Sequence, residues 1–325
     1  MDVFLGIDVG SVSTNIAVLD EQGKVIDTLY IRTQGRPIDA VQQGLRQIKD
    51  RNSNMIVKGV GTTGSGRQLA GVVLGADTIK NEITAHAVAA MHIVPDVHTI
   101  LEIGGQDSKI IIIRNGVVTD FAMNTVCAAG TGSFLDQQAA RLNLPIEEFG
   151  NQAFQSTTPV RVAGRCAVFA ESDMIHKQQT GHQIADILNG LCQALVRNYL
   201  NNVGKGKQIN SPIIFQGGVA ANKGMKRAFE EALQCEVIVP PHYNVMGAIG
   251  SAVLAKEQLN DKKPTAFRGF EMIDYVYTPR SFECDGCPNL CEVIELKMND
   301  QIAALWGDRC GKWMNSCQIK AVEAI

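Results

Sequence analysis

Long apolar runs and a strong charge of one sign are both missing from this sequence of 325 residues. No stretch of about 18 apolar residues occurs, which is the length that a membrane-spanning helix needs. The first residues contain no basic segment followed by an apolar one, so no secretory leader is expected. The formal net charge of -3 provides no broad basic surface for nucleic acid. We therefore expect a cytoplasmic globular protein whose partners are neither membranes nor nucleic acids.

Cysteine, in contrast, is plentiful. With 45% hydrophobic residues, the chain can bury a core large enough for two lobes or domains. Nine cysteines in a cytoplasmic chain are poor candidates for disulfides because thiols are kept reduced there, which favours metal, cluster or redox chemistry. They form a scattered set and a C-terminal set: Cys127, Cys166, Cys192 and Cys235, then Cys284, Cys287, Cys291, Cys310 and Cys317.

Short strands are predicted in two sets of three, separated by turn residues. The first set covers residues 3–8, 15–20 and 24–31, and the second covers 99–103, 109–114 and 117–122. Helical periodicity follows each set, over 40–49 in one case and 134–142 in the other. A repeat of strands and helices in this order predicts an α/β fold with two similar lobes.

The rest of the chain predicts further helices and one apolar strand. Apolar residues at helical spacing over 184–195 place Cys192 on a buried face, where it acts as a small hydrophobe. A strand and two helices are expected at 212–216, 225–233 and 246–256. The polar segment 260–265 is the expected linker because it ends the last helical pattern at a proline. We predict lobes at 1–98 and 99–259 and a small cysteine-rich segment at 264–325.

Three glycine-rich turns each follow a predicted strand, at residues 6–14, 103–108 and 215–222. Glycine lets backbone N–H groups approach a phosphate, and nearby hydroxyls and a metal-holding carboxylate complete such a site. One turn alone is more often an ordinary hairpin or strand-to-helix turn. Three of them in this order predict nucleotide binding.

These turns resemble the two phosphate motifs and the adenosine motif of the superfamily that contains actin, hexokinase and the large heat-shock chaperones. The resemblance implies that ATP or ADP binds with Mg²⁺ between two ribonuclease-H-like lobes, each built on a βββαβα motif. It implies that Asp8 and Asp107 organise Mg²⁺ and that Gln106 or Asp107 orients the attacking water. The implied nucleotide contacts are Gly10, Ser11, Ser13, Thr14, Gly104, Gly105, Gly217, Gly218 and Asn222.

Two of the scattered cysteines directly precede helical patterns. Cys127 begins the segment CAAGTGS, and Cys166 lies in GRCAVFAE. Free N–H groups and the positive dipole end at a helix start favour an anionic group such as a cluster. A 4Fe-4S cluster usually takes four thiolates, so two chains would share one across a two-fold axis and form a homodimer. The alternative is that both are inert buried cysteines, which is the commoner fate of a single cysteine.

A closer resemblance is carried by residues 126–142, 166–171, 217–222 and 244–252. These segments are similar to those of the activators of 2-hydroxyacyl-CoA dehydratases and of the ATPase subunits related to benzoyl-CoA reductase, the BadF/BadG/BcrA/BcrD-like family. The resemblance covers about residues 1–258. It implies a homodimer with one 4Fe-4S cluster bridged by Cys127 and Cys166, and it adds nucleotide contacts from Gly130, Thr131 and Gly132.

The same resemblance implies an oxygen-sensitive ATPase that transfers electrons. It would accept them from ferredoxin or flavodoxin and pass them to an iron–sulfur partner enzyme. The implied partners are a 2-hydroxyacyl-CoA dehydratase, an enzyme like benzoyl-CoA reductase or a double-cubane cluster protein.

The C-terminal cysteines have the spacing of a metal site. Cys284, Cys287 and Cys291 follow the pattern C-x2-C-x3-C, and Cys310 comes after eighteen further residues. A hairpin predicted over residues 293–306 would bring Cys310 back towards the other three. This core-poor segment needs a staple, which zinc would supply, whereas a second 4Fe-4S cluster would serve as an electron relay. Both metals remain open, and Cys317 is expected to be spare.

Two other functions compete with electron transfer. A small-molecule kinase of the same superfamily, acting for example on an amino sugar, would leave the cysteines without a role. It would also need a carboxylate base beside the sugar, which no feature of the sequence nominates. A chaperone or regulator that only binds ATP would need a peptide-binding domain that this length hardly provides. The cysteine pair favours the electron-transfer protein.

Overall fold

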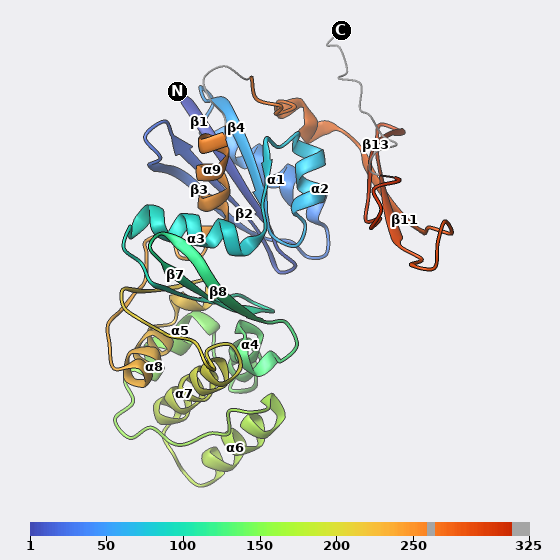
Figure 1. The fold of residues 1–325 in the computed structure, drawn as a ribbon. Helices are drawn as coiled ribbons and strands as arrows, with labels where there is room; N and C mark the ends of the chain where they lie inside the picture. Colours follow the sequence, from blue (N-terminus) through green and yellow to red (C-terminus); the bar gives the residue numbers. More distant parts are fainter. Residues whose placement is uncertain (259–263, 314–325) are drawn as a thin grey trace.

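The computed structural model describes residues 1–258 and 264–313 and contains two five-stranded sheets of the same design (Figure 1). In the first sheet, three consecutive strands pair antiparallel and two later strands extend it in parallel, in the order β3-β2-β1-β4-β5. The strands are β1 (Asp2–Val9), β2 (Ser13–Asp20), β3 (Val25–Arg32), β4 (Ile56–Thr63) and β5 (Thr78–Ile79).

The second sheet repeats this connectivity in the order β10-β9-β6-β7-β8. Its first three strands pair antiparallel, and β9 joins β6 in parallel. The strands are β6 (Thr99–Ile103), β7 (Ser108–Arg114), β8 (Val117–Asn124), β9 (Ile213–Gln216) and β10 (Val237–Ile238). The predicted repeat and both sets of three strands are therefore confirmed, with the ends shifted by two residues at most.

Four helices accompany the first sheet: α1 (Pro37–Arg51), α2 (Arg67–Leu74), α3 (Glu82–Ile93) and α9 (Met246–Gln258). After the second sheet, the chain returns to the first, and α9 packs against β1, β2 and β4. The predicted boundary at residue 98 therefore places α9 in a different lobe from the sheet that it covers. Helix α3 packs on α9 and also contacts β7 and β8, so it bridges the two lobes.

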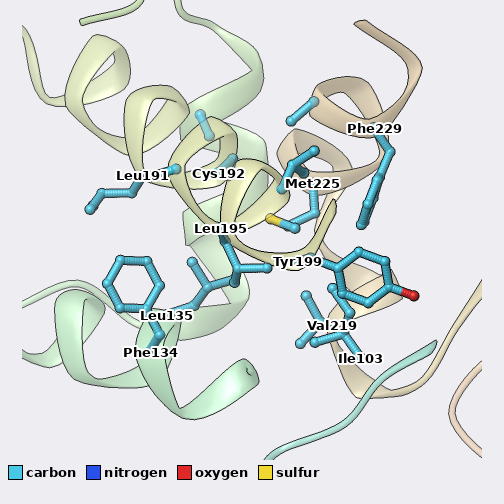
Figure 2. Packing of buried hydrophobic residues seen from close by; sticks show 14 of the residues in the cluster. Ile103, Phe134, Leu135, Leu191, Cys192, Leu195, Tyr199, Val219, Met225 and Phe229 are labelled. Atoms are coloured by element: carbon cyan, nitrogen blue, oxygen red, sulfur yellow. The ribbon is translucent and has the colours of Figure 1, made fainter. Parts of the chain in front are cut away.

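The second sheet carries five helices: α4 (Gly132–Arg141), α5 (Ile146–Phe154), α6 (Ala167–Gln179), α7 (Ile184–Asn202) and α8 (Lys223–Leu233). Helix α7 contacts α5, α6 and α8 and so forms the centre of this layer. Figure 2 shows Tyr199 of α7 beside Phe229 of α8, with ring centroids 5.4 Å apart and the rings nearly perpendicular. Cys192 is completely buried in this core, as its helical spacing predicts. None of the helices in the described part of the chain is long and apolar enough to cross a membrane.

The C-terminal segment forms a third, antiparallel sheet of β11 (Tyr277–Glu283), β12 (Glu292–Met298) and β13 (Gln301–Trp306), seen to one side of the first lobe in Figure 1. The predicted hairpin is confirmed, and Asn299 and Asp300 adopt positive φ in its turn. Most of the predicted linker, residues 260–263, and Cys317 lie outside the described residues.

A short 3-10 helix, η3 (Phe270–Asp274), attaches this segment to the first lobe. The side-chain amide of Gln42 on α1 donates to the carbonyl oxygens of Met272, Ile273 and Tyr275 at 3.2, 2.9 and 3.0 Å. Met272 and Ile273 are buried in the apolar core of the first lobe. The third sheet is thus anchored through the segment before it, and Leu296, Tyr277 and Trp306 of the sheet also pack on this core.

Replacing Gly6 by alanine should destabilise the protein, because a Cβ there would lie 1.8 Å from the carbonyl oxygen of Ala248 on α9. Overpacking a well-filled interior typically costs about 1–3 kcal/mol. A denaturant titration should therefore show a lower unfolding midpoint. The control Glu21→Ala changes an exposed turn and should alter stability by no more than about 0.5 kcal/mol. Equal midpoints for both variants would contradict the close packing of α9 on β1.

Candidate functional site

A cleft between the two sheets is lined by all three glycine-rich turns. Its inner cavity has a volume of about 140 Å³ and is lined by the turns that follow β1, β6 and β9. An adjoining outer cavity of about 380 Å³ extends towards α4, α5 and the 3-10 helix η2 (Gly218–Ala221). Gly104, Gly105 and Gly218 line both cavities, so the two lie side by side.

Most residues of the predicted nucleotide site line these cavities. Gly132 and Asn222 line the outer cavity. The inner cavity is lined by Asp8, Gly10, Ser11, Ser13, Gly104, Gly105, Gln106, Asp107, Gly217 and Gly218.

Thr14, Gly130 and Thr131 are not among the residues that line either cavity. Thr14 is buried, with its hydroxyl 3.0 Å from that of Thr33. The Thr131 hydroxyl donates to the carbonyl oxygen of Ala128 within its own loop. These side chains therefore serve the local structure of the turns.

Asp8 lies at the carboxyl end of β1, on the floor of the inner cavity. Two glycines let the backbone approach its carboxylate, because a Cβ at Gly247 or Gly64 would lie 2.2 or 2.5 Å from a carboxylate oxygen. Burial raises the pKa of Asp8 to about 7, with Glu82 adding to the rise and Lys109 opposing it. The Asp8 carboxylate therefore binds a proton far more readily than a free aspartate does.

Lys109 on β7 is the buried centre of positive charge in the cleft. Its ammonium group lies 2.8 Å from Asp107, 2.9 Å from Glu82 and 3.1 Å from Glu102. Burial opposes the charged form, but Glu102, Asp107 and Glu82 outweigh burial and raise the pKa of Lys109 above its usual range. Because Glu82 begins α3 and the other two carboxylates belong to the second sheet, Lys109 joins the two lobes across the cleft.

Gln106 occupies the tip of the turn after β6. The Ser11 hydroxyl donates to its side-chain oxygen at 2.7 Å. The first two glycine turns thus contact each other across the inner cavity.

Sequence reasoning missed the buried charges around these turns. Lys109 and Glu102 were visible as isolated charges in the otherwise apolar strands SKIIIIR and TILEI, and a buried charge requires a partner. His86 was also missed. Burial lowers its pKa to about 3, and its ring lies 2.8 Å from the side-chain amide nitrogen of Gln216.

Cys127 and Cys166 lie on two loops that α7 holds together. The Asn198 side-chain amide of α7 lies 2.6 Å from the Gly164 carbonyl oxygen and 3.9 Å from the Cys127 sulfur. Cys127 directly precedes the 3-10 helix η1 (Ala128–Gly130), and Cys166 directly precedes α6. Both thiols are partly exposed, so neither is fully buried.

The surface around these thiols is apolar and basic. Val126, Val168 and Phe169 are 95%, 67% and 66% exposed. A hollow of about 940 Å³ beside Cys166 is lined by four cations and, among the described residues, by no carboxylate. The four cations are Arg161, Arg165, Arg197 and Lys205.

The Cys127 loop is hydrogen-bonded directly to the wall of the nucleotide cavity. The Gly132 and Ser133 N–H groups donate to the carbonyl oxygens of Gly104 and Gly105, each at 2.9 Å. The Ser133 hydroxyl also donates to Gly105. A segment of seven residues thus joins a partly exposed thiol to the glycine-rich turn that follows β6.

No group of three or more His, Cys, Asp or Glu side chains within residues 1–258 and 264–313 is arranged to hold a metal ion. In the third sheet, Cys284 is buried and Cys291 is partly exposed, whereas Cys287 and Cys310 are exposed. Metal binding by these cysteines, by the Cys127 pair and by the carboxylates of the cleft stays a prediction.

Known proteins match the body of the chain. Residues 5–255 match the BadF/BadG/BcrA/BcrD ATPase family. The chain is 35% identical over 258 residues to the (R)-2-hydroxyglutaryl-CoA dehydratase activating ATPase of Acidaminococcus fermentans, covering 77% of this chain and 96% of that protein. The A. fermentans (R)-2-hydroxyglutaryl-CoA dehydratase component A superimposes with a TM-score of 0.73 at 32% identity, over 79% of this chain and 99% of that chain.

The activator of the 2-hydroxyisocaproyl-CoA dehydratase from Clostridium difficile, solved with bound ADPNP, is similar as well. It gives a TM-score of 0.72 at 29% identity, over 79% of this chain and 95% of that chain. These matches confirm the predicted family resemblance and the α/β fold. The matched family region ends before the third sheet.

Asp8→Asn should stabilise the nucleotide-free protein at pH 8 but hardly at pH 4. The pKa of Asp8 rises from 3.8 to about 7 on folding, so its charged form costs the folded state more as the pH rises through this window. The gain should reach roughly 1–4 kcal/mol above pH 7, at about 1.4 kcal/mol per pKa unit. Thermal unfolding at several pH values measures this difference. A gain that does not change with pH would contradict the raised pKa.

Lys109→Met should be severely destabilising because it leaves three carboxylates in the cleft without their counter-ion. Breaking a buried ion pair costs about 3–5 kcal/mol. The loss should be smaller at pH 5, where the abandoned carboxylates can bind protons. Lys207→Met is the matched control, since Lys207 pairs with the exposed Asp120 and such pairs contribute about 0–1 kcal/mol. Equal losses in the two variants, measured by thermal unfolding, would refute the central role of Lys109.

Proposed function

We propose, from the premise that this chain belongs to the BadF/BadG/BcrA/BcrD ATPase family, that it is an ATP-dependent activator that delivers low-potential electrons to an iron–sulfur partner enzyme. ATP hydrolysis would take place in the cleft, and the electron would leave through a 4Fe-4S cluster shared by two copies of the chain. The observation that carries this proposal is the hydrogen bonding of the Cys127 loop to the phosphate turn at Gly104 and Gly105.

The two cavities suit the two ends of ATP. The larger outer cavity, between α5 and η2, would take the adenosine, and the inner cavity, with its three glycine turns, would take the phosphates. The ADPNP bound to the C. difficile activator supports a nucleotide here. By analogy with the superfamily, Gly10, Ser11, Ser13 and Thr14 belong to the first phosphate turn.

The charge of the inner cavity supports a divalent cation beside the phosphates. It is lined by Lys109 and by four carboxylates, namely Asp8, Glu82, Glu102 and Asp107. A nucleotide triphosphate entering alone would meet excess negative charge, so we infer that Mg²⁺ accompanies it on Asp8 and Asp107. Bound Mg²⁺ would neutralise the charge that develops on the phosphates.

Gln106 or Asp107 would direct the attacking water. Ser11 fixes the Gln106 side chain, and Lys109 fixes Asp107 at 2.8 Å. Two polar side chains held at the tip of a phosphate turn can orient water for in-line attack. Positioning of this kind, with electrostatic stabilisation, accounts for most of the catalysis of phosphoryl transfer.

Cys127 and Cys166 fit a cluster shared between two subunits. Both thiols are partly exposed, both precede helix starts, and α7 brings their loops together. Such a pair supplies half of the four thiolates that a 4Fe-4S cluster takes, and a two-fold axis would supply the other half. A cluster held there would store and transfer single electrons.

The surroundings of the thiols support this homodimer. Val126, Val168 and Phe169 expose apolar surface that a second subunit would cover. The basic hollow beside Cys166 would stabilise the negative charge of thiolate-bound iron and sulfide.

The nucleotide state would reach Cys127 through backbone hydrogen bonds. Moving one electron uphill takes roughly 2.3 kcal/mol per 100 mV. Hydrolysis supplies this only if the nucleotide states differ in geometry or in partner affinity. Movement of the turn at Gly104 and Gly105 would draw Gly132 and Ser133 with it, and η1 would carry the movement to Cys127.

The partners follow from the relatives. Acyl-CoA dehydratases are named as the targets of similar activators, and a component of the benzoyl-CoA reductase of Thauera aromatica is 27% identical over 270 residues. We propose an iron–sulfur acceptor of this kind and ferredoxin or flavodoxin as the electron donor. The lobes proposed at 1–98 and 99–259 would close on the nucleotide, with α9 of the second segment covering the sheet of the first. The segment 264–325 would stay attached to the first lobe.

Serine at Cys127 or Cys166 should abolish cluster binding without harming the nucleotide site. Anaerobically purified wild-type protein should contain about four irons per dimer at this site, and each variant should lose them together with electron transfer. Nucleotide affinity should be unchanged, since neither thiol lines the cavities. Iron analysis, absorption spectra and nucleotide titration measure these properties.

The matched control is Cys235→Ser, which changes a partly exposed cysteine next to α8. It should retain iron and activity. Iron that persists in both the Cys127 and Cys166 variants would refute the ligand assignment. Colourless wild-type protein that phosphorylates an amino sugar would instead favour the kinase.

A further inference from the structure

The third sheet brings two cysteine-bearing segments to one of its ends, the loop from Cys284 to Cys291 and the stretch that contains Cys310. Cys284 follows the last residue of β11, and Cys291 precedes the first residue of β12, where Glu283 pairs with Glu292. At the same end, Trp306 closes β13 opposite Ile294 of β12, and Cys310 follows four residues later. Antiparallel pairing therefore gathers segments that are 26 residues apart in the sequence, from Cys284 to Cys310.

Contacts at this end draw the first three cysteines into one compact loop. The Cys284 N–H group donates to the Cys291 carbonyl oxygen at 2.8 Å, and the Leu290 N–H group donates to the Cys287 carbonyl oxygen at 3.2 Å. A Cβ built on Gly286 would lie 3.4 Å from the Cys284 sulfur, so the turn after Cys284 folds back against this thiol.

The apolar core of the third sheet is too small to hold this end together. Its cluster of buried apolar residues consists of Cys284, Val293 and Leu305, with Phe282, Cys291 and Trp313 packed around them. Sheets with so few buried side chains are usually held by a metal or a disulfide. Helix η3 anchors the N-terminal end of the segment, and Leu296 and Trp306 of the sheet also pack on the core of the first lobe. Cys284 and Cys291 belong to the separate small cluster, so a cross-link at the cysteine end would stabilise a part of the segment that the first lobe does not cover.

We propose that Cys284, Cys287, Cys291 and Cys310 bind a single zinc ion that cross-links the cysteine end of the third sheet. The four thiols of the described segment do not surround one point, and the Cys310 thiol lies 3.8 Å from an Asp308 carboxylate oxygen. Zinc binding would therefore require the exposed Cys287 and Cys310 side chains to rotate towards Cys284 and Cys291, which the sheet holds. Four sulfur ligands beginning with a C-x2-C pair suit the closed tetrahedral site of structural zinc. This site lies outside the matched family region and is independent of the cluster on Cys127 and Cys166.

The test is metal analysis of the full-length protein and of ligand variants. Wild-type protein should contain about one zinc per chain, with Zn–S distances of about 2.3 Å in X-ray absorption spectra. Cys310→Ser and Cys287→Ser should each lose that zinc, whereas Cys310→His should retain it because imidazole also binds zinc. Cys235→Ser is the control that should keep the full zinc content. The iron bound by Cys127 and Cys166 should be unchanged in every variant.

Three results would overturn the proposal: wild-type protein without zinc, zinc retained by both serine variants, or loss of iron from the serine variants. The last result would assign a second iron–sulfur cluster to these cysteines. Failure of the bridging cluster would show instead as missing iron in protein that still holds zinc, so the two proposals can fail separately.

Discussion

The Lys109 ammonium group is the charge on which the cleft depends, because it lies within 3.1 Å of carboxylates from both lobes. Each buried ion costs several kcal/mol of lost hydration, so this arrangement persists only where packing holds every member in place. Glu82 is held by α3, α3 rests on α9, and α9 sits on glycines of β1 and β4. A bound nucleotide and its cation would add charges beside Lys109 and its carboxylates, and would so change the strength of the Lys109–Glu82 ion pair between the lobes.

The two lobes carry different parts of the proposed site. Asp8 and the anchor of the third sheet belong to the first lobe, through β1 and α1 respectively. Both thiols of the proposed bridging cluster belong to the second lobe. A relative movement of the lobes would therefore shift the carboxylate on the cleft floor against the turn that carries the Cys127 loop, while the third sheet would move with the first lobe.

Local patterns predicted the strands and the glycine turns because alternation and turn residues act over a few positions. Contacts between distant segments were not predictable in this way. Helix α3 is rich in alanine and shows no strong apolar face. Its sequence therefore gave no basis for predicting which side packs on the cleft or that Glu82 pairs with Lys109. The alternation of β2 also separates neighbours: Ser13 faces the cavity, whereas Thr14 points to the opposite side and bonds Thr33.

The loop from Cys127 to Ser133 is short, so a movement of the turn at Gly104 and Gly105 would reach the Cys127 thiol. The Asn124 side chain forms two hydrogen bonds with the backbone of Cys127, the first residue of this loop. It donates to the Cys127 carbonyl oxygen at 2.9 Å and accepts from the Cys127 N–H group at 3.0 Å. Gly132 and Ser133 fix the other end to the phosphate turn. Only one 3-10 turn lies between, so a displaced phosphate turn must either break these hydrogen bonds or move the thiol. In a two-fold dimer, both nucleotide sites would then act on one shared cluster.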